Sequence, residues 1–327
     1  MNIAFLGLGA IGAPMAGHLA RPPFALTVWN RTAERARRFV ETRPTARMAE
    51  SAADAVRDAA VVITCLPSSR EVESLLDDGV LEAIAPGALF IDCTSGDPAT
   101  SRRLAARLAA RGIAFIDAPV SGGVVGAEKG KLTVMVGGTA ADLERAGPVL
   151  AAFGEKIVHC GAVGTGDALK AINNALLAVH VWTTAEGLAT LERAGVRADV
   201  ALDVINTSSG RSNASMNLFP ERVLTRAFPR TFRLALLDKD IGIAADLARE
   251  QKVPTPVIQL TAELFRMAHT QLGEEADHVE AARVVEQWAN VTIGGTPTDR
   301  VHATSAAFPP PATAPLPAPN AELEQDL

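Results

Sequence analysis

The sequence predicts two domains of different fold class, an α/β domain over residues 1–162 and an all-α helical domain over residues 163–293. In the first half, short apolar runs alternate with helix-forming segments, and a glycine-rich turn follows the first run. The second half carries long apolar-periodic segments without strand signals. Alternation of strands and helices indicates βαβ units around a parallel sheet, whereas the second pattern is typical of packed helices.

The first half contains six apolar runs that predict buried strands, and two of the intervening segments predict helices. The expected strands are residues 2–6, 26–29, 61–65, 88–92, 113–115 and 133–136, and the expected helices are residues 10–20 and 32–41. We expect the sheet region to end near His159.

The second half begins with a segment, residues 165–194, that is apolar around its whole circumference. Its apolar positions include Leu169, Ile172, Leu176, Leu177, Val181, Trp182 and Leu188. A helix with this pattern is expected to be buried on all sides. Further helices are expected at residues 199–207, 216–226, 235–251, 255–272 and 277–289. Residues 294–327 are rich in Pro and Ala with little periodic apolar surface, which predicts a disordered tail.

The bulk composition excludes several classes of function. The 327 residues carry a net charge of −6, which argues against a nucleic-acid partner. No uncharged apolar stretch reaches the roughly 18 residues of a membrane span, and the first apolar run leads directly into glycines, as a strand does and a signal peptide does not. The three cysteines are far apart and the histidines show no metal-binding spacing, so we expect neither a metal site nor a disulfide framework, and a cytoplasmic protein.

The glycine-rich turn reads Gly7-Leu8-Gly9-Ala10-Ile11-Gly12 and matches the pattern G-x-G-x-x-G. It follows a predicted strand and opens a predicted helix, which is the context that a dinucleotide site requires. Gly7 permits the tight turn, Gly9 lets the backbone approach the pyrophosphate, and Gly12 allows close helix–strand packing. The first domain is therefore predicted to be an α/β Rossmann domain. The alternative is an ordinary glycine turn.

The end of the second predicted strand indicates which nicotinamide cofactor is bound. NAD-selective sites usually place Asp or Glu there, where the side chain holds the ribose 2′-hydroxyl. This chain has Asn30-Arg31-Thr32 instead. Because an arginine can face a 2′-phosphate, NADP is favoured and NAD stays possible. The alternative is that Arg31 is only a solvated residue at the start of a helix and that the site accepts both cofactors.

A second candidate site follows the strand at residues 113–115, in Ser121-Gly122-Gly123. Two adjacent glycines beside a serine expose several backbone N–H groups and one hydroxyl, and such a concave arrangement suits a carboxylate. These three residues are therefore a candidate site for a carboxylate group. The alternative is a flexible loop between two strands.

The candidate acid/base is Lys170, which lies in the first turns of the long apolar helix. Burial or a neighbouring cation lowers the pKa of a lysine toward the working pH, as proton transfer requires. Asn174 lies four residues later, on the same helix face, where it can orient the lysine or the substrate. The alternative is a lysine that extends to solvent from the helix edge.

Three further segments complete the predicted site. Lys239 is expected to begin a helix, where a cation is unfavourable unless an anion lies nearby, and the alternative is a salt bridge with Asp238 or Asp240. Leu66-Pro67 and Ser95 follow predicted strands, at the sheet edge where such folds bind cofactors.

Taken together, these motifs resemble the β-hydroxyacid dehydrogenase family, which includes 3-hydroxyisobutyrate dehydrogenase. The matching residues run from Phe5-Leu6-Gly7 through to Lys239-Asp240-Ile241, and the resemblance covers residues 1–290. It implies that Lys170 and Asn174 are catalytic, and that Lys239 lies near cofactor and substrate. One departure is Gly96, which stands where the family has an aliphatic residue, so we expect a looser loop there.

The resemblance implies an oxidoreductase that transfers a hydride between NADP(H) and a small 3-hydroxy acid or its semialdehyde, with Lys170 exchanging the alcohol proton. It also implies a homodimer or homotetramer. Two alternatives stay open. Imine reductases share the architecture but resemble the family without its lysine, and a non-catalytic NADP-binding scaffold would keep the fold without turnover.

Overall fold

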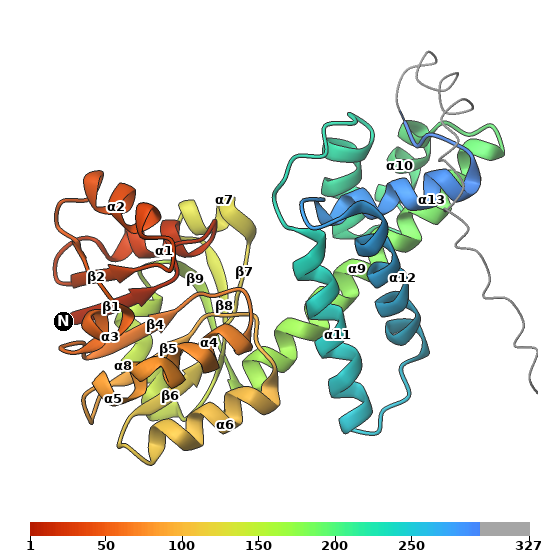
Figure 1. The fold of residues 1–327 in the computed structure, drawn as a ribbon. Helices are drawn as coiled ribbons and strands as arrows, with labels where there is room; N and C mark the ends of the chain where they lie inside the picture. Colours follow the sequence, from red (N-terminus) through yellow and green to blue (C-terminus); the bar gives the residue numbers. More distant parts are fainter. Residues whose placement is uncertain (295–327) are drawn as a thin grey trace, which may run out of the picture.

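The computed structural model describes residues 1–294 as two lobes joined by one long helix (Figure 1). The first lobe is a sheet with helices on both faces, and the second lobe is helical. The expected α/β Rossmann domain followed by an all-helical domain is therefore confirmed. Nearly all of the expected tail, from residue 295 onward, lies outside the described residues.

The sheet of the first lobe has nine strands in the order β3-β2-β1-β4-β5-β6-β8-β7, and β9 pairs with the free edge of β8. All six predicted strands are present. The bounds are β1 Asn2–Leu6, β2 Ala25–Trp29, β3 Arg47–Met48, β4 Val61–Thr64, β5 Leu89–Asp92, β6 Ala114–Asp117, β7 Val120–Ser121, β8 Leu132–Gly137 and β9 Gly154–Gly161.

The expectation of a purely parallel sheet is wrong beyond β6. Strands β1 to β6 are parallel to one another, but β8 is antiparallel to β6, β7 is antiparallel to β8, and β9 is parallel to β8. Between β6 and β8 the chain has only the two-residue strand β7 and α7 (Gly123–Glu128), a helix of six residues. At 1.5 Å per residue it spans about 9 Å, too little to carry the chain back for another parallel strand.

Helices cover both faces of the sheet, because alternate strand residues point to opposite sides. In β1, Ile3 and Phe5 join one buried cluster while Ala4 and Leu6 join another. The helices of this lobe are α1 Gly12–Leu19, α2 Ala33–Glu41, α3 Ala52–Val56, α4 Ser69–Leu75, η1 Leu76–Val80, α5 Leu81–Ala83, α6 Pro98–Ala109, α7 Gly123–Glu128 and α8 Ala140–Leu150.

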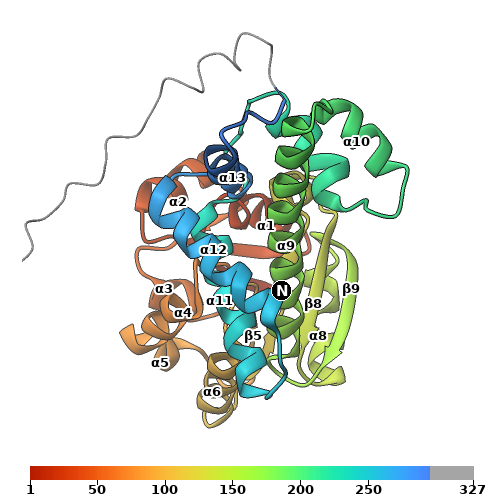
Figure 2. The ribbon, with the colours of Figure 1, turned by 90° about the vertical axis from the view of Figure 1, so that its right-hand side faces the viewer.

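The second lobe packs helices around α9, and Figure 2 shows α9, α11 and α12 side by side. The expected helices are all present within a few residues of their predicted ends. Their bounds are α9 Thr165–Arg193, α10 Ala198–Asn206, η2 Ala214–Val223, α11 Leu234–Glu250, α12 Pro256–Leu272, η3 His278–Glu280 and α13 Ala281–Ala289. In residues 1–294, none of these helices is long and apolar enough to cross a membrane.

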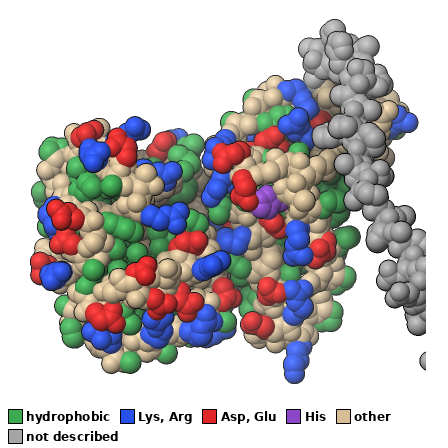
Figure 3. Space-filling model, viewed as in Figure 1, with side chains coloured by type: hydrophobic (Ala, Val, Ile, Leu, Met, Phe, Trp, Pro, Cys, Tyr) green, Lys and Arg blue, Asp and Glu red, His purple; other side chains and the backbone are tan. Residues whose placement is uncertain are grey.

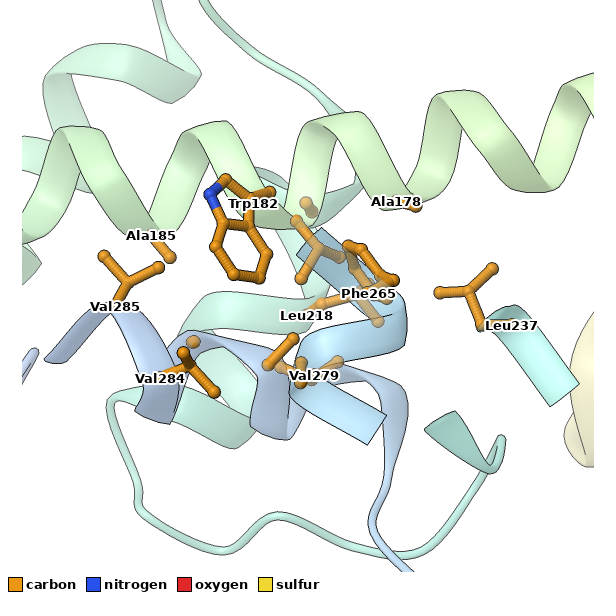
Figure 4. Packing of buried hydrophobic residues seen from close by; sticks show 14 of the residues in the cluster. Ala178, Trp182, Ala185, Leu218, Leu237, Phe265, Val279, Val284 and Val285 are labelled. Atoms are coloured by element: carbon orange, nitrogen blue, oxygen red, sulfur yellow. The ribbon is translucent and has the colours of Figure 1, made fainter. Parts of the chain in front are cut away.

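The core of the second lobe centres on Trp182 of α9 (Figure 4). Its ring centroid lies 5.8 Å from that of Phe265 on α12 and 5.7 Å from that of Trp288 on α13. Aromatic rings at this separation add about 0.5–1.5 kcal/mol per pair to the gain from burying their area. These contacts fix α12 and α13 against the helix that carries Lys170.

The expectation that α9 is buried on all sides is wrong for the single chain. Its small residues form the buried stripe, from Ala171 through Ala178 to Ala185. On another face, Leu169 is 45% exposed and Leu176 is 49% exposed. The apolar residues around α9 therefore belong to two faces, one packed inside the chain and one exposed to solvent.

Candidate functional site

The glycine turn between β1 and α1 has the geometry that its sequence predicts. Gly7 has φ +108°, and a Cβ added there would lie 2.4 Å from the Cys65 carbonyl oxygen. A Cβ at Gly12 would lie 2.0 Å from the Gly7 oxygen, whereas a Cβ at Gly9 would meet nothing within 4 Å. Gly7 and Gly12 are thus packed tightly against neighbouring protein atoms, whereas the space beside Gly9 is open. No side chain caps the α1 N-terminus, so its first N–H groups are available to an anion.

Asn30 at the end of β2 ties the glycine turn to the start of α2. Its Oδ1 accepts a hydrogen bond from Leu8 N at 2.9 Å, and its Nδ2 donates to Thr32 O at 3.0 Å. Arg31 and Thr32 are exposed beside it. Where an NAD-selective enzyme has an acidic side chain for the ribose, this chain has the amide of Asn30, which holds the glycine turn. Arg31 is the charged side chain next to it.

A shallow hollow of about 380 Å³ lies beside the glycine turn, and its wall carries arginines that sequence reasoning missed. Arg38 is bonded to Glu34, and the Arg43 guanidinium lies 4.6 Å from the Phe39 ring centroid. The lining residues are Leu8, Gly9, Ala10, Ala13, Arg35, Arg38, Phe39 and Arg43. The available signal was Arg35 and Arg38, three residues apart on one face of the helix expected at residues 32–41.

The carboxyl ends of β4 and β5 lie side by side at the same sheet edge, as expected for Leu66, Pro67 and Ser95. Leu66 N donates to Thr94 Oγ1 at 3.1 Å, which links the two loops. The expected looseness at Gly96 is wrong, because Gly96 N donates to Asp167 Oδ1 at 3.1 Å. A Cβ at Gly96 would lie 2.7 Å from Ser69 Oγ, so glycine here allows tight packing.

Ser121, Gly122 and Gly123 lie where β7 turns into α7. Gly122 has φ +136° and Gly123 has φ +63°, a pair of conformations that glycine adopts without strain. Gly122 and Gly123 are exposed and Ser121 is half-buried, so the hydroxyl and the first N–H groups of α7 face outward. This geometry can accept a carboxylate, and no contact connects these three residues directly to Lys170.

Lys170 and Asn174 lie one turn apart on α9 and face α11 across the lobe. Asn174 is buried, and its Nδ2 donates to Asp240 Oδ2 at 2.6 Å. The Lys239 ammonium lies 2.8 Å from Asp240 Oδ1 and donates to Ser95 O at 2.5 Å. Asp240, which sequence reasoning treated only as a salt-bridge alternative, thus contacts two of the predicted site residues, and Lys239 links them to a third, Ser95. Its charge also acts on Lys170.

The prediction that Lys239 begins a helix is wrong. It is the sixth residue of α11, which starts at Leu234. The helix dipole therefore does not explain why a cation is placed there. The ion pair with Asp240 does, and it is the alternative that the sequence left open.

The environment of Lys170 favours its neutral form. Burial lowers the pKa of the Lys170 ammonium, Lys239 lowers it further, and Asp240 opposes both effects. A lysine whose pKa lies below its usual range can accept a proton from an alcohol at moderate pH. This is the electrostatic setting that the acid/base prediction requires.

Three buried carboxyl groups, Asp92, Asp117 and Asp167, connect the sheet to the start of α9, and sequence reasoning missed them. Asp117 accepts hydrogen bonds from Gly164 N at 2.7 Å and Asp167 N at 3.0 Å, and so caps the helix that carries Lys170. Burial raises the pKa of Asp117, raises that of Asp167 well above its usual range, and raises that of Asp92 to about 6.

The residues predicted to serve the cofactor and the proton transfer come from both lobes. The glycine turn, Leu66 and Ser95 follow β1, β4 and β5, and Lys239 reaches Ser95 from the helical lobe. Figure 3 shows the surface hollowed between the lobes, with charged side chains of both signs beside it. Within residues 1–294 no group of three or more His, Cys, Asp or Glu side chains is arranged to hold a metal ion.

Comparison with known protein families assigns both lobes. Residues 2–161 match the NAD binding domain of 6-phosphogluconate dehydrogenase, and residues 164–285 match the NAD-binding domain of NADP-dependent 3-hydroxyisobutyrate dehydrogenase. The chain belongs to the β-hydroxyacid dehydrogenase family. The resemblance inferred from the sequence motifs is thereby confirmed.

Two relatives from Pseudomonas aeruginosa show how far the family similarity extends. An NAD-dependent L-serine dehydrogenase is 39% identical over 284 residues, which are 84% of this chain and 95% of the relative. A 3-hydroxyisobutyrate dehydrogenase is 37% identical over 292 residues, which are 86% of this chain and 97% of the relative. This β-hydroxyacid dehydrogenase family member is accordingly an enzyme, an NAD(P)-dependent oxidoreductase of hydroxy acids.

Solved structures agree with the assignment. The 3-hydroxyisobutyrate dehydrogenase of Mycobacterium tuberculosis, determined with L-serine, has a TM-score of 0.80 at 32% identity over 87% of this chain and 98% of its own. An imine reductase from Streptomyces aurantiacus has a TM-score of 0.59 at 19% identity, over 87% of this chain and 99% of its own, a likeness of fold alone. The imine reductase alternative is therefore the more distant one.

Proposed function

We propose that this enzyme oxidises a small 3-hydroxy acid with NADP⁺, and reduces the corresponding semialdehyde, with Lys170 as the acid/base. The observation that carries the proposal is the charge environment of half-buried Lys170, on which Asp240 and Lys239 both act. Asp240 is buried, accepts from Asn174 and pairs with Lys239, and Lys239 reaches the first lobe at Ser95 O. In oxidation, neutral Lys170 accepts the hydroxyl proton as the C–O bond becomes a carbonyl, and in reduction the ammonium returns that proton. The cofactor supplies the hydride acceptor.

The substrate carboxylate is proposed to bind Ser121, Gly122 and Gly123. Their outward N–H groups and hydroxyl support this assignment, as do the carboxylate-bearing compounds in the names of the similar enzymes. L-serine and 3-hydroxyisobutyrate are therefore the first compounds to test, followed by 3-hydroxypropionate and tartronate. The carboxamide of the best substrate should lose about 30- to 1000-fold in kcat/KM.

NADP(H) is proposed as the preferred cofactor because the ribose position carries no acidic side chain and has Arg31 instead. Arg35, in the first turn of α2, supports a site for the 2′-phosphate, since it lines the hollow beside the glycine turn. Fluorescence titration should give tighter binding of NADPH than of NADH. Arg31→Ala should weaken only NADPH, while Arg57→Ala, at an exposed position on α3's C-terminus, should weaken neither. Equal affinities for the two cofactors in the parent enzyme would contradict the assignment.

The decisive test of the chemistry is a comparison of three lysine variants in the oxidation assay. Lys170→Ala should lower kcat by at least about 100-fold with cofactor affinity unchanged. Lys170→Arg should not restore turnover, because a guanidinium does not release its proton near neutral pH. Lys131→Ala, which removes an exposed lysine paired with Glu155, should behave as the parent. A Lys170→Arg enzyme with parental kcat would refute the acid/base role.

We also propose that the enzyme is a cytoplasmic homodimer or homotetramer assembled through its helical lobe. Leu169 and Leu176 on α9 and Val200 and Val204 on α10 are large apolar side chains exposed in the single chain. Apolar surface of this kind is typical of a contact between subunits. Light scattering should give a mass of at least two chains, and Leu176→Glu should reduce it. A monomeric parent at micromolar concentration would refute the assembly.

A further inference from the structure

Asp240 is a buried carboxylate that contacts two of the site residues. Its side chain is only 3% exposed. Oδ2 accepts the hydrogen bond from Asn174 Nδ2 at 2.6 Å, and Oδ1 lies 2.8 Å from Lys239 Nζ. A buried carboxylate needs such partners, and here both of them are residues proposed to serve the reaction.

The contact with Asn174 fixes the orientation of that amide. Asn174 Oδ1 accepts a hydrogen bond from Asn173 Nδ2 at 3.1 Å, while Nδ2 is held by Asp240. Reversal of the amide would place an oxygen against the Asp240 carboxylate. One N–H of Asn174 therefore stays free and points in a defined direction.

The contact with Lys239 fixes a cation at the lobe junction. Neighbouring residues on a helix do not normally face each other, yet the Lys239 ammonium turns back to Asp240 and also donates to Ser95 O. Asp240 and Lys239 are also the two charged groups that act on Lys170, so without the Asp240 charge only the repelling cation would remain.

We propose that Asp240 is a positioning residue that orients Asn174, holds Lys239 against Ser95, and balances the charge around Lys170. Its kinetic consequence rests on the proposed function of Lys170, but its electrostatic consequence does not. The groups that act on Lys170 are Asp240 and Lys239, both on α11. Other titratable groups on the elements packed against α9 have partners of their own. Asp117 accepts from Gly164 N, and Asp167 accepts from Ser101 Oγ. His159 contacts Gly138 O, His269 contacts Asp238, and Glu286 pairs with Arg226.

The test replaces Asp240 with an isosteric neutral side chain. In Asp240→Asn the amide oxygen can take the place of Oδ2 and still accept from Asn174, but the negative charge is lost. Because the Asp240 charge raises the pKa of Lys170, that pKa should fall in the variant. Lys239→Met removes the repelling cation and should move the pKa of Lys170 in the opposite direction.

Two measurements read this shift. Competitive acetylation of Lys170 with acetic anhydride, followed by mass spectrometry across a pH series, reports the titration of the amine without turnover. The pH dependence of kcat/KM for oxidation reports it through the proposed reaction. The control is Asp238→Asn, which removes the preceding carboxylate on α11, bonded to His269 and not to the site, and should leave both midpoints unchanged.

The outcomes separate this proposal from the proposed function. A lower labelling midpoint in Asp240→Asn and a higher one in Lys239→Met support the positioning role, even if the kinetic profile has no basic limb and the acid/base role fails. Unchanged labelling midpoints in both variants would overturn the positioning role. This holds even if kcat falls by the same factor at every pH. If Asp240→Asn does not fold, the same labelling series on Asp240→Ser decides, and an unchanged midpoint there overturns the proposal.

Discussion

Replacement of Asp92 by asparagine should stabilise the protein more at neutral pH than at acid pH. Asp92 is fully buried at the end of β5, where Oδ1 accepts hydrogen bonds from Thr64 Oγ1 at 2.8 Å and Thr94 N at 3.0 Å. Burial raises its pKa from 3.8 to about 6, and nearby Asp117 adds to the effect. The asparagine Oδ1 atom can accept both hydrogen bonds while the charge is absent.

The sign and size follow from proton linkage. Because the folded state binds this proton more tightly than the unfolded chain, stability falls as pH rises from about 4 to about 6. Two pKa units at 1.36 kcal/mol each make the cost about 3 kcal/mol above pH 6. At pH 4.5 the same linkage gives a stability cost of about 1 kcal/mol. The stabilisation by Asp92→Asn should therefore be larger by about 2 kcal/mol at pH 7.5 than at pH 4.5.

The assay is urea unfolding followed by tryptophan fluorescence at pH 7.5 and pH 4.5, at one fixed protein concentration. The free energy of unfolding is compared between parent and variant at each pH. Asp58→Asn, at an exposed position after α3, is the matched control and should show the same difference at both pH values. An Asp92→Asn variant that is destabilised equally at both pH values would show that the ionised carboxylate is not the source of strain.

Three further substitutions test the cofactor turn, the core and the carboxylate site. Gly12→Val should weaken NADPH binding at least tenfold, because its Cβ would lie 2.0 Å from Gly7 O, and unchanged titration curves would contradict this. Phe265→Ala should cost about 3–5 kcal/mol in urea unfolding, since the ring is fully buried against Trp182, and a loss below 1 kcal/mol would be inconsistent with that packing. Ser121→Ala should raise KM more than it lowers kcat, and the reverse pattern would count against carboxylate binding.

Much of the fold and part of the site were predictable because their signals are local. The strand from Asn2 to Leu6 and the glycine turn after it are encoded within eleven consecutive residues, and so is the helical spacing of Lys170 and Asn174. Each needs only the chain's own periodicity and the conformational freedom of glycine. The α9 helix was predicted for the same reason, with its ends correct to within one residue.

The features that sequence reasoning missed depend on residues that are distant in the chain. Asp240 meets Asn174 across 66 positions, and Asp117 meets Gly164 across 47. Which face of α9 is covered depends on where α11 and α13 pack, so the exposure of Leu176 could not be predicted from its own helix. The reversed direction of β8 depends on a short α7, whose length a glycine-rich sequence does not fix.

The loop after β5 shows how the two lobes depend on each other for function. Ser95 O accepts from Lys239 on α11, and the next residue, Gly96, donates its N–H to Asp167 on α9. Two consecutive backbone groups at the cofactor edge are therefore held by two helices of the other lobe. Because Asp167 lies three residues before Lys170 and Lys239 is bound to Asp240, a shift of this loop would move the charges around the proposed acid/base. The backbone of one lobe thus binds residues that lie near the lysine carried by the other.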